Sequence, residues 1–350
     1  MKGHKIHCIF DDGNSLDFDC SAEDSLITGA EKQGLSFVFG CRQGVCGTCK
    51  VRCTEGSVNH GEQASLDVLP EEEREQGYIL SCVASPRSDL VIEFPYDAVD
   101  VGVDSDATSS IATVLGCEQL STTVFRYRLQ HMSEEGSQPE ALEFIPGQYM
   151  ELNIPESDYW RAFSMSSVPD EKGEMEFIIR LQDKGKFSNY LRDAVKVGQQ
   201  VKMNGPYGQF TLEPSNRVRA FVAGSTGLAP LVSMLRGMAL TNDNGEAHLF
   251  FGMGDPETFF YEEELRQLEK AMPNLKLHLF LISPADDWSG EKGSAVDGFR
   301  KQFDGTGVLP DVYICGPDGM IKATEQVCSE LGIPAEQQFK EIFVASGRTK

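Results

Sequence analysis

The chain has 350 residues, 40% of them hydrophobic, and its 31 Lys and Arg against 54 Asp and Glu give a formal net charge of −23 at pH 7. This length predicts two or three domains, and the negative balance argues against nucleic-acid binding, which needs a basic surface. The sequence has no apolar run long enough for a membrane span, and residues 1–7 lack the apolar stretch of a signal peptide. We therefore expect a cytoplasmic protein with reduced cysteines.

The first part of the chain predicts a small domain of short strands and helices. Residues 5–10 and 15–20 alternate around a turn-rich tetrad, which is typical of a β-hairpin. A helix is expected to begin at Ser21 or Asp24. Further along, a short helix is predicted at 70–74, and strands are predicted at 78–80 and 90–94.

Three cysteines follow the spacing C-x₄-C-x₂-C, and a fourth stands alone much later in the chain. This is the ligand spacing of a plant-type two-iron, two-sulfur cluster, and Gly44 and Gly47 suit a loop that turns sharply around it. A zinc site or a disulfide framework is the alternative, but zinc sites usually use two close cysteine pairs or Cys/His pairs. The candidate metal ligands are Cys41, Cys46, Cys49 and Cys82.

This pattern resembles the plant-type ferredoxins, and the resemblance implies a β-grasp ferredoxin domain over residues 1–98 with a 2Fe-2S cluster. The stretch that follows, residues 99–110, is small and acidic, which predicts a linker. Short strand patterns broken by Gly and Pro then predict an antiparallel β-barrel over 111–214. The remaining part, 215–350, alternates strands and helices.

The barrel segment contains a motif that resembles the Arg-x-Tyr-Ser flavin motif of the ferredoxin–NADP reductase family. The resemblance implies that Arg161 pairs with the FAD pyrophosphate, that Phe163 lies against the flavin ring in place of the usual Tyr, and that Ser164 hydrogen-bonds near flavin N5. Two further stretches, 178–180 and 185–188, resemble the family's second and third flavin contacts. The implied flavin-binding residues are Arg161, Ala162, Phe163, Ser164, Ile178, Ile179, Arg180, Lys186, Phe187 and Ser188.

An apolar strand at 219–223 runs into Gly224-Ser225-Thr226-Gly227 and a helical pattern, an arrangement that places a pyrophosphate at a helix N-terminus. The run resembles the family's Gly-Gly-Thr-Gly-x-x-Pro, with Ser225 in place of the second Gly and Pro230 at its end. The resemblance implies a parallel-sheet α/β domain that binds a nicotinamide nucleotide through Gly224, Ser225, Thr226, Gly227 and Pro230.

Acidic residues after the next strand favour NADH over NADPH. Asp255 and Glu257 could bond a ribose 2′-hydroxyl but would repel a 2′-phosphate, and no Lys or Arg occurs from 252 to 265. The alternative is that these acids only precede the helix that begins near Glu262.

Asp311 begins what we expect to be the last strand, which ends in Cys315-Gly316-Pro317. This end resembles the family's Cys-Gly-Pro, in which the thiol lies near nicotinamide and flavin; a buried apolar filler is the alternative for Cys315. Near the carboxyl end, Glu341 and Phe343 resemble the family's terminal acid-x-aromatic, which approaches the flavin, with core packing as the alternative. The residues implied in catalysis are Ser164, Cys315, Glu341 and Phe343.

Together these modules predict a multidomain α+β and α/β protein that moves electrons from NADH to FAD to 2Fe-2S. The domain order resembles the reductase components of bacterial multicomponent oxygenases, most closely soluble methane monooxygenase and phenol hydroxylase reductases. The resemblance implies a separate oxygenase partner that docks near the ferredoxin domain. The chain itself has no Glu-x-x-His and no Cys-x-His pair, so oxygen activation is expected on another polypeptide.

Two other functions stay open. One is the reductase of a Rieske-type aromatic-ring dioxygenase, which shares this domain order. The other is a non-catalytic redox sensor or electron-transfer module with a vestigial nucleotide site. The complete set of flavin and nucleotide motifs argues against the sensor, whereas no motif separates a di-iron partner from a Rieske partner.

Overall fold

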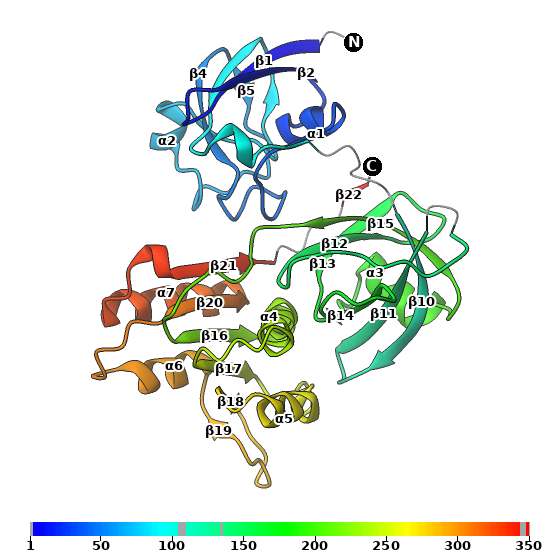
Figure 1. The fold of residues 1–350 in the computed structure, drawn as a ribbon, viewed down its shortest axis with the longest axis vertical. Coiled ribbons are helices and arrows are strands. Elements are labelled where there is room, and N and C mark those ends of the chain that lie inside the picture. Colours follow the sequence, from blue (N-terminus) through cyan, green and yellow to red (C-terminus); the bar gives the residue numbers. More distant parts are fainter. Residues whose placement is uncertain (1–2, 104–109, 134–135, 344–347, 350) are drawn as a thin grey trace. The chain divides into compact units, whose positions relative to one another are not determined.

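The computed structural model describes residues 3–103, 110–133, 136–343 and 348–349, and these fall into two compact units (Figure 1). One unit contains residues 3–103 and the other contains 110–343 with 348–349. Residues 104–109 of the predicted linker lie outside the described residues.

The first unit is built on a five-stranded sheet with the order β2-β1-β8-β4-β6. The predicted hairpin is present, because β1 and β2 pair antiparallel along their whole length, while β1 pairs parallel with β8. A parallel pair between the first and last strands, with a helix across the sheet, is the β-grasp arrangement that the resemblance implied. The strands are β1 (Gly3–Ile9), β2 (Ser15–Ser21), β4 (Lys50–Glu55), β6 (Tyr78–Leu80) and β8 (Leu90–Glu93).

The helices of this unit begin where local capping places them. Helix α1 (Leu26–Glu31) starts later than predicted, because the Ser25 hydroxyl accepts the Thr28 N–H at 3.2 Å and so acts as the N-cap. Helix α2 (Glu71–Glu75) carries three acids in its first turn after Pro70, as predicted. The minor elements are β3 (Leu35–Ser36), β5 (Val58–Asn59), β7 (Ser85–Pro86), η1 (Ala98–Asp100) and β9 (Gly102–Val103), with β3 paired to β9 and β5 to β7.

The second unit begins with an antiparallel seven-stranded sheet of order β14-β11-β10-β15-β12-β13-β22. A bridge between Met165 and Phe177 connects the end of β13 to β14 and closes the sheet into the predicted barrel. Tyr127, Phe177 and Met203 are fully buried inside it. Its elements are β10 (Ser110–Gln119), β11 (Val124–Met132), β12 (Tyr149–Asn153), β13 (Tyr159–Ser164), β14 (Glu174–Arg180), α3 (Lys186–Asn189), η2 (Tyr190–Ala194), β15 (Gln200–Tyr207) and β22 (Arg348–Thr349).

A parallel six-stranded sheet of order β19-β18-β17-β16-β20-β21 follows in the same unit. Helices α4 and α5 share one hydrophobic core with alternate residues of its strands, and α6 and α7 share the other, so they cover opposite faces. The elements are β16 (Arg219–Gly224), η3 (Ser225–Gly227), α4 (Leu228–Leu240), β17 (Ala247–Met253), α5 (Glu262–Ala271), β18 (Leu275–Leu281), β19 (Glu291–Lys292), α6 (Ala295–Phe303), β20 (Asp311–Gly316), α7 (Asp318–Leu331), η4 (Ala335–Gln337) and β21 (Gln338–Ile342).

One expectation about this sheet was wrong: β20 is not its last strand. Strand β21 adds a parallel edge beside β20, with Cys315 in register with Glu341. Its sequence, Gln338–Ile342, lacks the continuous apolar run of the central strands because an edge strand is half exposed. The strand order reverses between β16 and β20, which is where open α/β sheets bind ligands.

Candidate functional site

The four predicted metal ligands come together as two pairs of thiols. The sulfur atoms of Cys49 and Cys82 lie 3.1 Å apart in a buried position. The Cys41 N–H points at the Cys46 sulfur at 3.3 Å, and the Cys41 and Cys46 side chains are also hydrogen-bonded. All ten cysteines are free thiols. Two pairs of cysteines are the donor set that two bridged irons require.

The backbone of the cluster loop explains the glycines between its cysteines. Gly44 and Gly47 both have positive φ, at +74° and +81°, and a Cβ at residue 44 would approach the Gln63 carbonyl oxygen at 3.0 Å. The hydrogen bond between the two thiols lowers the pKa of Cys46 and raises the pKa of Cys41, so one proton is shared within this buried pair. These features fit a 2Fe-2S cluster.

Among the described residues, no group of three or more His, Cys, Asp or Glu is arranged to hold a single metal ion. The cluster cysteines are consistent with this, because a two-iron cluster distributes its four ligands between two irons and does not gather them around one.

The predicted flavin motif lies on β13, and its arginine is the most informative residue. Within the described residues, Arg161 Nη1 is buried and has no hydrogen-bond partner. Burial lowers the pKa of this guanidinium, and its nearest aromatic neighbour is the Tyr159 ring, 5.0 Å away. A half-buried guanidinium with one buried, unpartnered N–H fits an anionic group such as a pyrophosphate.

The third flavin motif meets the first at the same aromatic ring. Lys186, at the start of α3, lies 5.1 Å from the Tyr159 ring centre, so two cations flank one tyrosine. Phe163 packs against the buried Phe187 with ring centres 4.8 Å apart. Sequence reasoning missed Tyr159, although its place two residues before Arg161 on the same strand face was a usable signal.

The other predicted flavin residues occupy different environments. Ser164 is buried at the end of β13, and Ala162 is exposed. The Ser188 hydroxyl accepts the Gln182 N–H at 2.8 Å and therefore already has a local role. In β14, Ile178 and Ile179 point into opposite hydrophobic cores. Arg180, the last residue of the strand, is exposed.

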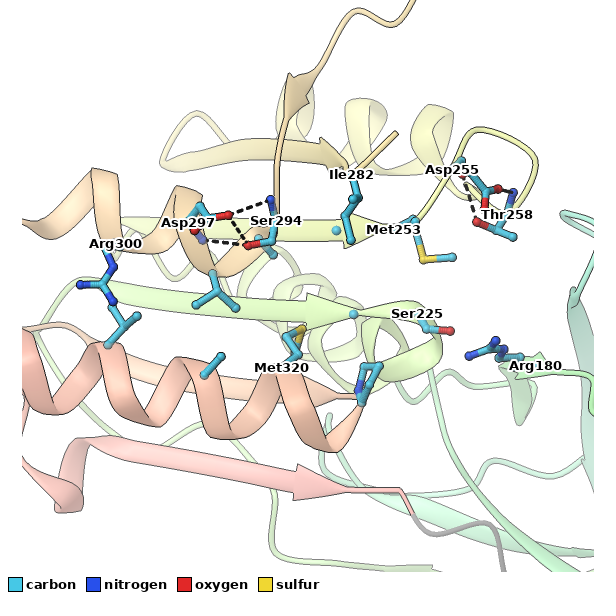
Figure 2. A pocket seen from close by; sticks show the side chains of 18 of the residues that line it. Arg180, Ser225, Met253, Asp255, Thr258, Ile282, Ser294, Asp297, Arg300 and Met320 are labelled. Atoms are coloured by element: carbon cyan, nitrogen blue, oxygen red, sulfur yellow. Dashed lines mark hydrogen bonds between the residues drawn. The ribbon is translucent and has the colours of Figure 1, made fainter. Parts of the chain in front are cut away.

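Beside the nucleotide loop lies a cavity of about 650 Å³. Figure 2 shows Arg180 and Ser225 at one end and Arg300 at the other. The cavity runs along the carboxyl ends of β16, β17 and β18 and is bounded by α6 and α7. Its lining includes the predicted Arg180, Gly224, Ser225, Asp255 and Pro317, and also Thr123, Met253, Thr258, Ile282, Ser294, Asp297, Arg300, Met320 and Gln326.

The predicted nucleotide loop packs closely against its neighbours, and one of its residues has a strained backbone. A Cβ at Gly227 would overlap the Cys315 carbonyl oxygen, and one at Gly224 would lie 2.7 Å from the Met320 sulfur. Ser225 has φ +52°, a left-handed backbone that favours glycine. In the part of the chain that the structure describes, its buried hydroxyl has no hydrogen-bond partner. This unsatisfied hydroxyl on the cavity wall fits a polar group of a bound nucleotide.

The two acids predicted to read the ribose lie differently. Asp255 lines the cavity, where its carboxylate accepts the Thr258 N–H at 3.0 Å. The described residues that line the cavity do not include Glu257. The backbone carbonyl oxygen of Glu257 instead accepts the Thr122 hydroxyl at 3.2 Å. The sequence motifs did not indicate the cation at the other end of the cavity, Arg300 of α6. Arg300 forms an ion pair with Glu330 of α7.

The remaining predicted residues surround the end of β20. Cys315 is fully buried in the core shared with α4, and this burial raises the pKa of its thiol well above the ordinary value. Glu341 is 7% exposed on the adjacent strand, whereas Phe343 is 44% exposed. Thr226 is half-buried, and Gly316 and Pro230 are buried.

Three stretches of the chain match known domain families. Residues 9–87 match the 2Fe-2S iron-sulfur cluster binding domain, residues 112–212 the oxidoreductase FAD-binding domain, and residues 221–326 the oxidoreductase NAD-binding domain. With the site geometry, these matches define the class of protein: a flavin- and iron-sulfur-dependent NADH oxidoreductase.

Relatives cover nearly the whole chain. It is 33% identical to the toluate 1,2-dioxygenase electron transfer component of Pseudomonas putida over 344 residues, 98% of this chain and 99% of the relative. It is 36% identical to methane monooxygenase component C of Methylosinus trichosporium over 270 residues, 77% and 78% of the two chains. The chain belongs to this family of electron-transfer reductases.

A solved structure supports the same fold. The crystal structure of a cytochrome P450 reductase from Amycolatopsis is similar with a TM-score of 0.79 and 26% identity, covering 97% of this chain and 98% of the other. Of the helices in the described part of the chain, none has the length and apolar character that crossing a membrane requires.

Proposed function

We propose that this reductase delivers its electrons to a separate oxygenase component. The observation that carries the proposal is that one chain contains a cysteine loop that fits a 2Fe-2S cluster, an arginine on the flavin strand with one buried, unpartnered N–H, and a nucleotide cavity. FAD, when bound, supplies the conversion of a two-electron donor into single electrons. The protein then binds the flavin and the nucleotide, orients them toward each other and excludes water from between them.

Within that function, Arg161 and Lys186 bind the flavin pyrophosphate from both sides of Tyr159. Their support is the unsatisfied Arg161 Nη1 and the convergence of two cations on one ring. Phe163 lies against the flavin ring, held by its contact with Phe187. Ser164, buried at the strand end, orients the ring edge where hydride arrives.

For the nucleotide, Ser225 and the first turn of α4 contact the phosphates, and Asp255 contacts the adenosine ribose. Cys315 acts through its backbone, because its carbonyl packs against Gly227 and its side chain is fully buried. Glu341 and Phe343 stand next to this strand end and are the chain's remaining candidates for contact with the flavin. Asp255 is the support for NADH over NADPH, since a carboxylate repels a 2′-phosphate.

The partner we favour is a di-iron monooxygenase, with a Rieske-type dioxygenase as the second candidate. Methane monooxygenase component C and a phenol hydroxylase protein of Acinetobacter pittii support the first, and the toluate 1,2-dioxygenase component supports the second. Docking near the ferredoxin domain is supported by the need to bring an acceptor close to the cluster. The acidic charge of the chain favours a basic docking face on the partner.

We also propose the domain boundaries 1–98, 111–214 and 215–350 with a linker at 99–110, and a reducing, cytoplasmic location for a chain whose ten cysteines form no disulfide.

The test is electron transfer between purified components. Protein reduced with NADH is mixed with candidate di-iron and Rieske oxygenase components, and cluster reoxidation is followed by stopped-flow absorbance. We expect fast reoxidation by one class only. Reoxidation by neither class, together with steady NADH-driven ferricyanide reduction, would contradict an oxygenase partner; absence of NADH-driven reduction altogether would favour the sensor.

A further inference from the structure

A partly buried network of charges joins the barrel to the parallel sheet inside the second unit. Glu176, on β14, accepts a hydrogen bond from Arg236 of α4 at 3.0 Å and another from the Tyr261 hydroxyl. Arg126, on β11, lies 3.3 Å from Glu176 and also pairs with Glu264 of α5. The Glu176, Arg126 and Arg236 side chains are 16%, 16% and 28% exposed.

The same network holds the chain just after the flavin motif. Arg236 Nη1 donates to the Ser166 carbonyl oxygen at 2.8 Å, and the Ser166 hydroxyl donates to Glu176 at 2.9 Å. The Ser233 hydroxyl donates to the Ser167 carbonyl oxygen at 2.6 Å. Ser166 is two residues beyond Ser164, the last residue of β13.

Helix α4 is also the helix that follows the nucleotide loop. It begins at Leu228, three residues after Ser225, and both Ser233 and Arg236 lie on it. The contacts therefore connect the end of the flavin strand to the helix that carries the nucleotide site. The hydrogen bonds of Arg236, Ser166 and Ser233 are directional, so the network favours one orientation of the two sites more strongly than apolar packing would.

We propose that Glu176 and Arg236 are positioning residues for hydride transfer: they fix the nicotinamide site against the flavin site and touch neither substrate nor cofactor. The inference rests on the proposed function, since it concerns the geometry between those two sites. Small displacements of reacting groups cost large factors in rate, so loss of the network should slow the hydride step more than it weakens binding.

The principal test is Glu176→Gln, which keeps the shape of the side chain and removes its charge. In stopped-flow reduction by NADH, we expect the limiting rate of flavin reduction to fall about 10- to 100-fold, with the apparent Kd for NADH within about threefold. The long-wavelength charge-transfer absorbance between nicotinamide and reduced flavin should weaken in parallel, because it depends on ring overlap.

The matched control is Glu262→Gln, which removes a carboxylate from an exposed ion pair with Arg266 at the start of α5. It should leave the rate, the charge-transfer band and the melting temperature unchanged. Arg236→Lys is the second variant: it keeps the charge but cannot contact Ser166, Glu176 and Tyr261 at once, so it should reproduce the slow hydride step with full FAD content.

Two results would overturn the inference. One is a limiting rate of flavin reduction that is unchanged in both variants. The other is a loss of rate that only follows loss of FAD, or that disappears once the rate is corrected for the fraction of folded protein at the assay temperature. Either would make the network structural alone. A wild-type protein that NADH cannot reduce would instead contradict the proposed function.

Discussion

At the scale of single residues, Arg161 is a clear case of a group that the described residues leave unsatisfied. Its Nη1 is buried, and nothing in the described residues accepts its hydrogen bond. A buried donor without a partner destabilises the fold, while a charge-assisted hydrogen bond to a ligand contributes about 1.5–3 kcal/mol. The same side chain should therefore affect apo stability and flavin binding in opposite directions.

We predict that Arg161→Ala weakens FAD binding about 10- to 150-fold, which is that energy range expressed as an equilibrium. The melting temperature of the apo protein should not fall. FAD titration followed by fluorescence, with thermal unfolding of both forms, measures the two effects. Arg128→Ala, at an exposed position of β11, is the control and should change neither. Unchanged FAD affinity in the Arg161 variant would remove it from the flavin site.

Ser225 combines a left-handed backbone, at φ +52°, with a buried hydroxyl that no described residue binds. Two substitutions separate these features. Ser225→Ala removes only the hydroxyl, so the apparent Kd for NADH should rise about 2- to 10-fold through loss of one hydrogen bond. Ser225→Gly also relieves the backbone, so it should stabilise the protein by about 1 kcal/mol relative to Ser225→Ala. Equal stability of the two variants in urea unfolding would refute the strain.

At the scale of elements, the approach of β20 to the nucleotide loop requires a glycine at one position. Gly227 has a negative φ, so an alanine is allowed by its backbone, but its Cβ would overlap the Cys315 carbonyl oxygen. Gly227→Ala should destabilise the second unit by about 1–3 kcal/mol through overpacking. Gly319→Ala, in the first turn of α7 with open space around it, should be neutral or slightly stabilising. Chemical unfolding that gives both variants the same stability would contradict this packing.

The network between β14 and α4 gives the second unit a pH dependence. Burial would raise the pKa of Glu176, but Arg236 and the hydrogen bonds from Tyr261 and Ser166 outweigh burial and hold it below its ordinary value of 4.5. A lowered folded-state pKa stabilises the fold above about pH 4.5. This contribution is lost as the pH falls through the folded-state value.

We therefore predict that Glu176→Gln destabilises the protein at pH 7 and that its difference from wild type shrinks toward pH 4. Urea unfolding of both proteins across this range is the measurement. Glu262→Gln serves again as the control. A difference that stays constant down to pH 4, or grows, would mean that the Glu176 charge does not stabilise the fold.

At the scale of the whole molecule, the cluster and the nucleotide site lie in different compact units, so their functions should separate. Cys46→Ser removes one ligand of the Cys41–Cys46 pair and should abolish electron transfer to the oxygenase. Flavin reduction by NADH should stay nearly intact. The half-buried Cys53, which is not a predicted ligand, provides the control Cys53→Ser. Rapid-mixing reduction and oxygenase-coupled turnover are measured on the same samples, and equal loss of both would contradict separate modules.

Much of the fold could be predicted because its signals are local. The alternation of β1 and β2, the apolar runs of β16 and β20 and the acids at the start of α2 and α5 each reflect a short stretch of chain. Strand β21 was missed and α1 begins later than the predicted Ser21 or Asp24, because an edge strand lacks a continuous apolar run and several neighbouring residues can cap a helix. Arg300, Ile282 and Ser294 were missed because only folding brings them to the nucleotide cavity.

The sequence by itself determined the three modules, their order and their cofactors, since cysteine spacing and the flavin and nucleotide motifs are contiguous in the chain. Only the tertiary structure decided the detailed pairings: Cys82 with Cys49 within the ligand set, Tyr159 as the ring beside both Arg161 and Lys186, and Glu176 with Arg236 between two sheets. The physical reason is that such contacts depend on packing across many residues, and no short segment encodes where its surface will be buried.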